Sequence, residues 1–128
     1  MARIMLAEDD NSMRGFLAAA LTRAGHEVVA FADGWSALGG EPAGYDLLIA
    51  DIVMPGMDGV ELARRARQVC PDLRVMFITG FAAVVLDRGR SPLPGASVLS
   101  KPFHLKALVA HVDRLLASPA ISAGPAAS

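Results

Sequence analysis

Cysteine, aromatic residues and long apolar runs are all scarce in this sequence. The single cysteine, Cys70, excludes an internal disulfide framework, and we expect it to be a packing residue because no histidine or cation is next to it in sequence. The N-terminus lacks a basic stretch followed by a long apolar segment, so neither a signal peptide nor a membrane span is predicted. We therefore expect a cytoplasmic protein.

An excess of charge of one sign is also missing. The 12 Lys and Arg residues are scattered among 13 Asp and Glu residues, and the formal net charge is −1. Proteins that bind nucleic acid usually carry a basic patch that pairs with phosphates, so no nucleic-acid partner is predicted. Hydrophobic residues make up 53% of the 128 residues, which is enough for the core of one domain.

Short apolar runs alternate with helical patterns along the chain. The runs that favour strands occupy residues 3–7, 28–31, 47–51, 75–78 and 98–100. Strands that alternate with helices imply right-handed parallel crossovers, and hence an α/β protein built as a three-layer α/β/α sandwich around a five-stranded parallel sheet. We expect one domain over residues 1–117 and, because residues 118–128 show no periodicity, a disordered C-terminal tail.

The helices are predicted from apolar residues at helical spacing. The first is expected to be capped by Asn11 or Ser12 and ended by Gly25, and the next two to be capped by Asp33 and Asp58. The residues expected to face the core include Phe16, Leu17, Leu21, Leu62, Ala63, Ala66, Val69 and Leu108. Trp35 is interpreted as a packing or partly covered residue. Glycines and prolines in residues 81–96 predict only a short helix and a loop there.

Four of the predicted strands end in polar residues. Glu8 and Asp9 follow the first strand, Asp51 ends the third, Thr79 follows the fourth and Lys101 follows the fifth. The carboxyl ends of parallel strands share one edge of the sheet, which is where open α/β sheets bind ligands. Three carboxylates cannot all be ionised at close range without a counter-charge, and oxygen ligands favour Mg²⁺.

A carboxylate beside Mg²⁺ can act as the nucleophile toward a phosphoryl group. The Lys101 ammonium and the Thr79 hydroxyl would then supply positive charge and a hydrogen bond to the phosphoryl oxygens. Each residue alone has a simpler explanation, since acidic clusters often cap helices and Thr-Gly and Lys-Pro often mark turns and loops. Their occurrence together at four strand ends favours the phosphoryl interpretation.

These residues resemble a known family. The Glu8-Asp9 pair, Asp51 in Asp-Ile-Val-Met-Pro-Gly-Met-Asp-Gly, Thr79-Gly and Lys101-Pro-Phe, in this order over residues 2–117, are similar to the receiver domain of two-component response regulators. The resemblance implies a flavodoxin-like, CheY-like doubly wound sheet with strand order 2-1-3-4-5. It also implies that Asp51 accepts a phosphoryl group from a histidine kinase or a histidine phosphotransfer protein.

The resemblance assigns roles to the other site residues. Asp9, Asp51 and the main-chain carbonyl of Val53 would bind Mg²⁺, with Glu8 assisting through water. Thr79 and Lys101 match the switch hydroxyl and the phosphate-pairing lysine, and the peptide bond between Lys101 and Pro102 is usually cis in the family. Receivers often carry an aromatic residue three positions before the lysine, where this chain has Val98. That departure argues against an aromatic rotamer switch at this position, although Phe81, two residues after Thr79, could partly substitute.

The segments 79–84 and 98–105 are more similar to the CpdR-like single-domain regulators of alphaproteobacteria. Those regulators act, when unphosphorylated, as adaptors that prime the ClpXP protease to degrade cell-cycle proteins. The resemblance implies ClpXP and its substrates as partners, with phosphorylation of Asp51 switching the adaptor off. Apolar residues of 81–86, together with Phe103 and His104, are a candidate docking surface, although the residues of 81–86 would equally suit the core.

Two other functions remain open. A phosphoryl sink or shuttle in a phosphorelay would use the same Asp51 chemistry. A Mg²⁺-dependent phosphohydrolase usually has a second acid two residues after its aspartyl nucleophile, where this chain has Val53, so we expect catalysis only of the protein's own phosphorylation and dephosphorylation. Val53 and Phe81 would flank the path of the hydrolytic water, which predicts slow self-dephosphorylation. His104 and His111 are too far apart for a compact metal site.

Overall fold

The computed structural model describes residues 1–80 and 93–117, and the structural statements below refer to these residues. The elements in chain order are β1 (Arg3–Ala7), α1 (Asn11–Arg23), β2 (Glu27–Phe31), α2 (Gly34–Gly39), the 3₁₀ helix η1 (Pro42–Gly44), β3 (Leu47–Asp51), α3 (Gly59–Val69), β4 (Arg74–Thr79), β5 (Ser97–Ser100) and α5 (Leu105–Ala117). The predicted short helix in 81–96 and the predicted tail fall largely or wholly outside the described residues.

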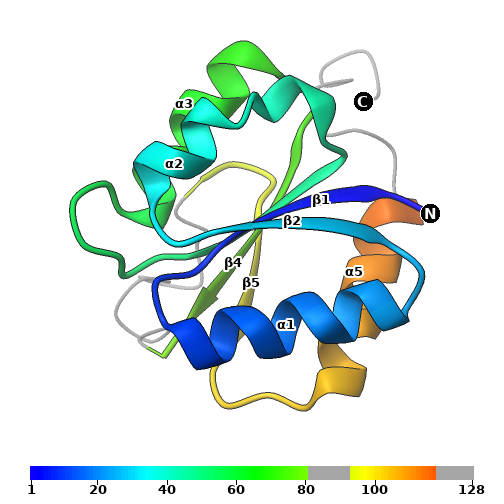
Figure 1. Ribbon diagram of the computed structural model, residues 1–128. Helices are drawn as coiled ribbons and strands as arrows, with labels where there is room; N and C mark the ends of the chain where they lie inside the picture. The colour runs from blue at the N-terminus through cyan, green and yellow to red at the C-terminus, as the bar shows by residue number, and fades with distance from the viewer. Residues whose placement is uncertain (81–92, 118–128) are drawn as a thin grey trace.

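The five strands form one parallel sheet in the order β2-β1-β3-β4-β5. Helices α2 and α3 cover one face of this sheet, and α1 and α5 cover the other (Figure 1). The predicted α/β/α sandwich and its strand order are therefore confirmed. In the register, Ala7 lies opposite Ala50, Asp51 opposite Ile78, and Thr79 opposite Ser100, so the carboxyl ends of four strands meet at one edge.

The core is divided by the sheet into two apolar clusters. Strands β1, β3 and β4 are buried almost throughout, because helices cover both of their faces. Successive side chains of a strand point to opposite faces, so Met5 packs with Phe77 and Leu62 on the α2–α3 side, while Ile4 and Leu6 belong to the cluster on the α1–α5 side. No residue of the edge strands β2 and β5 is fully buried.

Aspartates cap three of the helices. The side chains of Asp10, Asp33 and Asp58 each accept a hydrogen bond from the backbone N–H three residues later. The caps at Asp33 and Asp58 were predicted, whereas the expectation of Asn11 or Ser12 for α1 was wrong. Asp10 has the extended backbone of a cap, and Asn11 is already the first helical residue. Gly25 ends α1 as predicted, with a φ of 103°.

Two residues expected to face the core, Phe16 and Val69, are exposed instead, whereas Trp35 was expected to be a packing or partly covered residue and is partly covered. Phe16 and Trp35 are each 58% exposed, and Val69 is 61% exposed. Phe16 and Val69 lie at the margin of their helices' apolar stripes. The guanidinium of Arg65 lies over the ring of Trp35, 5.1 Å from its centroid. Cys70 is half-buried against the core, as predicted. None of the helices in the described part of the chain is long and apolar enough to span a membrane.

Candidate functional site

An acidic cleft opens at the edge where the strands end. Residues that follow β1, end β3 and follow β5 line this cleft of about 320 Å³. The lining residues are Glu8, Asp9, Asp10, Asp51, Val53, Gly80 and Lys101. The structure thus brings together every residue of the expected site except Thr79, which lies directly before Gly80.

Asp51 is held in the cleft by two hydrogen bonds. It ends a fully buried strand and is itself only 7% exposed. Its Oδ1 atom accepts from the backbone N–H of Val53 at 3.1 Å, and its Oδ2 atom accepts from Lys101 Nζ at 2.9 Å. A buried carboxylate is stable when it is paired and hydrogen-bonded in this way. The ammonium and the carboxylate are therefore already in contact before any ligand is present.

Glu8 is more deeply buried than Asp51, at 1% exposed. Its Oε2 atom accepts from the backbone N–H of Asp10 at 3.1 Å, but its buried Oε1 atom accepts no hydrogen bond from any described residue. Lys101 Nζ lies 3.5 Å from this oxygen. Burial, reinforced by the charge of Asp51, raises the pKa of Glu8 to about 7 despite the opposing hydrogen bond from Asp10.

Lys101 is the cation between these two carboxylates. Partial burial lowers the pKa of its ammonium, but the hydrogen bond and charge of Asp51, together with the charge of Glu8, outweigh that effect and leave the pKa raised. The lysine therefore stays protonated at neutral pH. Its positive charge only partly compensates the two acids that it faces.

The three acids could hold a metal ion. Glu8, Asp9 and Asp51 can each place one carboxylate oxygen so that the three oxygens lie within 4.8 Å of one another. The donors are all oxygens, Asp9 is exposed to solvent, and the Glu8 oxygen lacks a hydrogen-bond donor in the described structure. This set fits a hard cation that keeps part of its water shell, which is the preference of Mg²⁺.

Thr79 connects the last two strands at the same edge. It is fully buried at the end of β4, and its carbonyl accepts from the backbone N–H of Lys101 at 2.8 Å. The peptide bond between Lys101 and Pro102 is cis, as the resemblance implied. The backbone that positions the Lys101 side chain is thus anchored directly on Thr79.

Asp10 and Gly80 line the cleft but were not predicted as site residues. Asp10 has two roles, because its side chain caps α1 and its N–H donates to Glu8. The run Glu8-Asp9-Asp10 contains three acids, and the third was overlooked because the cap was assigned to Asn11 or Ser12. Gly80 has no side chain whose chemistry could have identified it.

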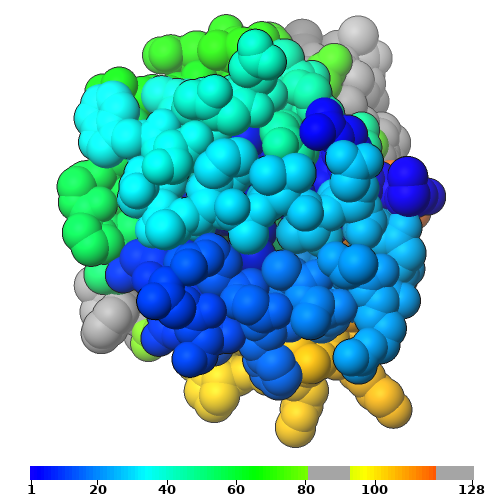
Figure 2. Space-filling view, viewed as in Figure 1, coloured from blue at the N-terminus to red at the C-terminus, as the bar shows by residue number. Residues whose placement is uncertain are grey.

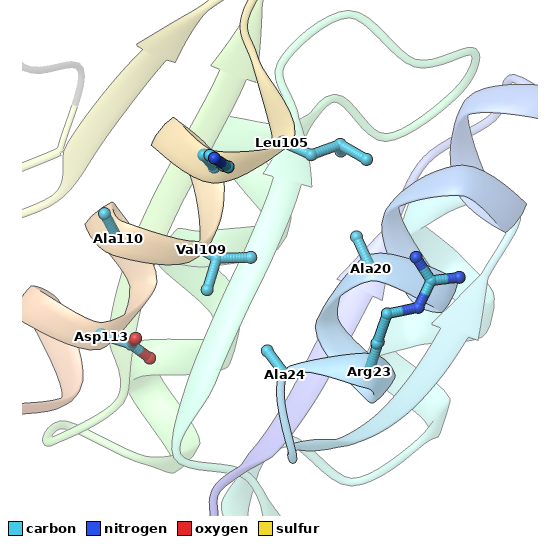
Figure 3. Close-up of a pocket in the computed structure, with 8 residues that line it drawn as sticks. Ala20, Arg23, Ala24, Leu105, Val109, Ala110 and Asp113 are labelled. Atoms are coloured by element: carbon cyan, nitrogen blue, oxygen red, sulfur yellow. The ribbon is translucent and has the colours of Figure 1, made fainter.

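Other hollows lie away from the carboxylates. A hollow of about 370 Å³ beside the cleft is lined by Met13, Phe16, Lys101, Pro102 and Phe103. A wider one of about 530 Å³ separates α1 from α5, with Ala20 and Ala24 facing Leu105 and Val109, and with charged residues at its rim (Figure 3). His104 and His111 join no cluster of metal-ligating groups within residues 1–80 and 93–117.

Comparisons with known proteins identify the family of this chain. The family model described as the response regulator receiver domain matches residues 4–113. The chain is 56% identical over 119 residues to the response regulator receiver protein CpdR of Brucella abortus (strain 2308), a match that covers 91% of this chain and 98% of that protein. Two further relatives, the sensor kinase CckA of Brucella abortus (strain 2308) and the transcriptional regulatory protein TctD of Salmonella typhimurium (strain SL1344), are longer proteins, of which the chain spans 12% and 51%.

Solved structures give the same result. The receiver domain of the hybrid histidine kinase CckA is 38% identical, with a TM-score of 0.76 over 89% of this chain and 98% of that one. The response regulator TrrA of Thermotoga maritima, solved in complex with Mg²⁺ and BeF, is 29% identical, with a TM-score of 0.78 over 90% of this chain and 99% of that one.

Proposed function

Because the chain belongs to the response regulator receiver domain family, we propose that Asp51 accepts a phosphoryl group from the phosphohistidine of a histidine kinase or a histidine phosphotransfer protein. One observation carries this proposal: Lys101 Nζ is hydrogen-bonded to a buried Asp51 carboxylate, in a cleft that it shares with Glu8 and Asp9. An exposed acid with no cation beside it would be open to bulk water and would lack the positive charge that stabilises phosphoryl transfer.

The transfer is an in-line displacement at phosphorus. An oxygen of the Asp51 carboxylate forms the new P–O bond while the P–N bond of the donor breaks, and the imidazole leaves with that electron pair and takes up a proton from solvent. The product is an acyl phosphate, which carries more negative charge than the carboxylate. Lys101, already 2.9 Å from Asp51, would then pair with a phosphoryl oxygen.

A magnesium ion would be held by Asp9, Asp51 and the carbonyl of Val53, with Glu8 acting through water. When bound, Mg²⁺ supplies charge neutralisation at the phosphoryl oxygens. The Oε1 atom of Glu8, which accepts no hydrogen bond from the described residues, and the oxygen-only donor set support this assignment. So does the related TrrA structure, whose complex contains Mg²⁺ and BeF.

The phosphoryl group would signal through β4 and β5. The Thr79 hydroxyl is proposed to donate to a phosphoryl oxygen, and the Thr79 carbonyl already holds the Lys101 backbone. The two residues proposed to bind the phosphoryl oxygens are therefore Thr79, at the end of β4, and Lys101, directly after the neighbouring strand β5. Val98, which is half-buried on β5, offers no aromatic ring for a rotamer switch.

The donor protein needs a surface next to the cleft. The hollow lined by Met13, Phe16 and Phe103 lies beside Lys101, and Phe16 is exposed there. An exposed aromatic residue at the rim of a polar site is a typical anchor for a partner protein. We assign this hollow to the donor.

The output is proposed to be that of an adaptor. The chain matches 98% of the length of CpdR at 56% identity, so the receiver surface alone would carry the output, as in the CpdR-like regulators. On this proposal the unphosphorylated protein primes ClpXP to degrade its substrates, and phosphorylation of Asp51 switches that activity off. A phosphohydrolase is not favoured, because the cleft position two residues after Asp51 is filled by the apolar and 54% exposed Val53.

Affinity capture tests the adaptor proposal. Asp51→Ala protein and wild-type protein held with Mg²⁺ and beryllofluoride are compared as baits in the same lysate. Recovery of the unfoldase and protease, or of their substrates, with only the Asp51→Ala bait is the expected result. Recovery of only kinases or phosphotransfer proteins would replace the adaptor with a phosphoryl sink or shuttle.

A further inference from the structure

Helices α2 and α3 carry an exposed surface that the phosphoryl chemistry does not use. We call it the α2–α3 surface and define it by Trp35 and Leu38 on α2 and by Glu61, Arg65 and Val69 on α3. Trp35 is 58% exposed and Val69 is 61% exposed. A hollow of about 500 Å³ lies between the helices and is lined by Leu38, Pro42, Glu61, Arg65, Gln68 and Val69.

Helix geometry aligns these residues into two facing rows. Trp35 and Leu38 are three residues apart on α2, and Glu61, Arg65 and Val69 are spaced by four on α3, so each set shares one side of its helix. The guanidinium of Arg65 lies over the Trp35 ring and also lines the hollow, which joins the two rows into one surface. The atoms of α2 and α3 meet along one side of the molecule in Figure 2.

The charges of three neighbouring side chains on α3, Glu61, Arg64 and Arg65, are unbalanced. Glu61 accepts hydrogen bonds from two arginines: Arg65 Nε donates to Oε2 at 2.7 Å, and Arg64 Nη1 donates to Oε1. One carboxylate therefore faces two guanidinium groups, which leaves one net positive charge. The two terminal nitrogens of Arg65 donate to no acceptor within the described residues. Planar guanidinium groups with free N–H donors bind carboxylates well.

We propose that the α2–α3 surface binds an acidic segment of a partner protein in which apolar side chains are flanked by carboxylates. An apolar side chain of that segment would enter the hollow and cover Trp35, and a carboxylate would pair with the terminal nitrogens of Arg65. Burial of an aromatic ring and desolvation of an arginine are the contacts that most often dominate the energy of an interface. A basic segment would lack the carboxylate that Arg65 is proposed to bind.

This surface can be occupied independently of the acidic cleft. The hollow assigned to the phosphoryl donor, which Met13 and Phe16 of α1 help to line, lies on the other face of the sheet from α2 and α3 (Figure 1). The inference therefore does not depend on the proposed phosphoryl chemistry. Loss of binding here would leave phosphorylation of Asp51 intact, and failure of the phosphorylation assay would leave this binding intact.

The only tryptophan in the chain is Trp35, so intrinsic fluorescence reports on the surface directly. Three synthetic peptides without aromatic residues serve as probes: one with leucines between aspartates and glutamates, one with lysines in place of the acids, and one with serines in place of the leucines. Only the acidic leucine peptide is expected to shift the Trp35 emission to shorter wavelength, with an affinity that falls as salt rises. Equal binding of the lysine peptide, or binding of none, overturns the proposal.

Substitutions test whether the peptide binds at the α2–α3 surface and not elsewhere on the protein. Trp35→Ala and Arg65→Gln are each expected to weaken binding of the acidic leucine peptide roughly tenfold or more in calorimetry, since both are central contacts. Arg65→Lys should retain part of the affinity, which distinguishes loss of charge from misfolding. Arg23→Gln removes an exposed arginine of α1, on the opposite face of the sheet, and should leave the peptide affinity unchanged.

Two further results would each overturn the proposal. Unchanged peptide affinity in Arg65→Gln overturns the proposed charge pairing. A shift of Trp35 emission with protein concentration alone, accompanied by a dimer in sedimentation that Trp35→Ala abolishes, would identify a second copy of this chain as the occupant instead.

Discussion

Gly59 lies so close to Asp51 that a Cβ atom on it would come within 2.3 Å of the Asp51 carbonyl oxygen. Its N–H donates to the carbonyl of Ile52 at 2.9 Å, so the first turn of α3 rests directly against the end of β3. A Cβ atom would also lie 2.9 Å from the Asp51 carbonyl carbon. Only glycine permits this contact, which makes it part of what positions Asp51.

Gly59→Ala is expected to destabilise the protein by about 1–3 kcal/mol, the usual cost of overpacking, and to slow phosphorylation by displacing Asp51. Urea unfolding and a donor-dependent phosphorylation assay measure the two effects. Gly15→Ala is the matched control. A Cβ atom on Gly15, which lies within α1, would meet nothing within 4 Å, and alanine there should stabilise the protein by about 0.5–1 kcal/mol. Equal effects of the two substitutions would contradict the contact.

Burial of Glu8 makes stability depend on pH. Because its pKa rises from 4.5 to about 7 in the folded protein, the folded state binds the proton more tightly. The resulting stabilisation is complete below pH 4.5 and is lost as the pH rises through about 7. Relative to wild type without Mg²⁺, Glu8→Gln should therefore gain free energy of unfolding above pH 7. Urea titrations at several pH values test this, and Mg²⁺ should reduce the difference. A constant difference across pH would count against a raised pKa.

Lys101→Met is expected to separate metal binding from phosphoryl transfer. Removal of the ammonium takes away the cation that pairs with Asp51 and Glu8, so Mg²⁺ should bind several-fold more tightly in calorimetry. Phosphorylation should fall by at least about tenfold, because no cation is left to pair with a phosphoryl oxygen. Lys106→Met, an exposed lysine of α5, should alter neither. Weaker Mg²⁺ binding in Lys101→Met would show that the lysine helps to organise the acids.

Val53 is expected to prolong the phosphorylated state. Its exposed side chain lines the cleft and would obstruct a water that attacks the acyl phosphate. Val53→Asn places a polar group there and should shorten the lifetime of the phosphoryl group several-fold. The measurement is the loss of radiolabel from purified protein after removal of the donor. Wild-type decay within seconds, or an unchanged lifetime in Val53→Asn, would contradict this role.

The acidic cleft was predictable because strand ends are strongly marked in a sequence. Apolar runs that stop at Glu8, Asp51 and Lys101 place these residues at one edge of any parallel sheet, and the register confirms that edge. What the sequence could not reveal was the distribution of contacts within the cleft. The unpartnered Oε1 atom of Glu8 depends on where Lys101 and Asp10 donate, and those donors are set by tertiary structure.

Which apolar side chains of the helices remain exposed to solvent was harder to predict than the strand ends. Helical spacing identifies the apolar stripe that contains Phe16 or Val69, but the width that the sheet covers decides which residues at its margin remain exposed. The cap of α1 was misplaced by one or two residues because Asp10, Asn11 and Ser12 all favour that position. Only the extended backbone at Asp10 distinguishes it.

The strands that supply the site differ in how firmly they are held. Glu8 and Asp51 extend from β1 and β3, two of the three interior strands, whereas Lys101 follows β5, an edge strand with no fully buried residue. Backbone amides of buried central strands exchange with deuterium most slowly, and those of exposed edges exchange first. The acidic wall of the cleft is thus expected to open more slowly than the side that carries Lys101. The cation that partly compensates this wall follows an edge strand, which local opening is expected to release before the interior strands.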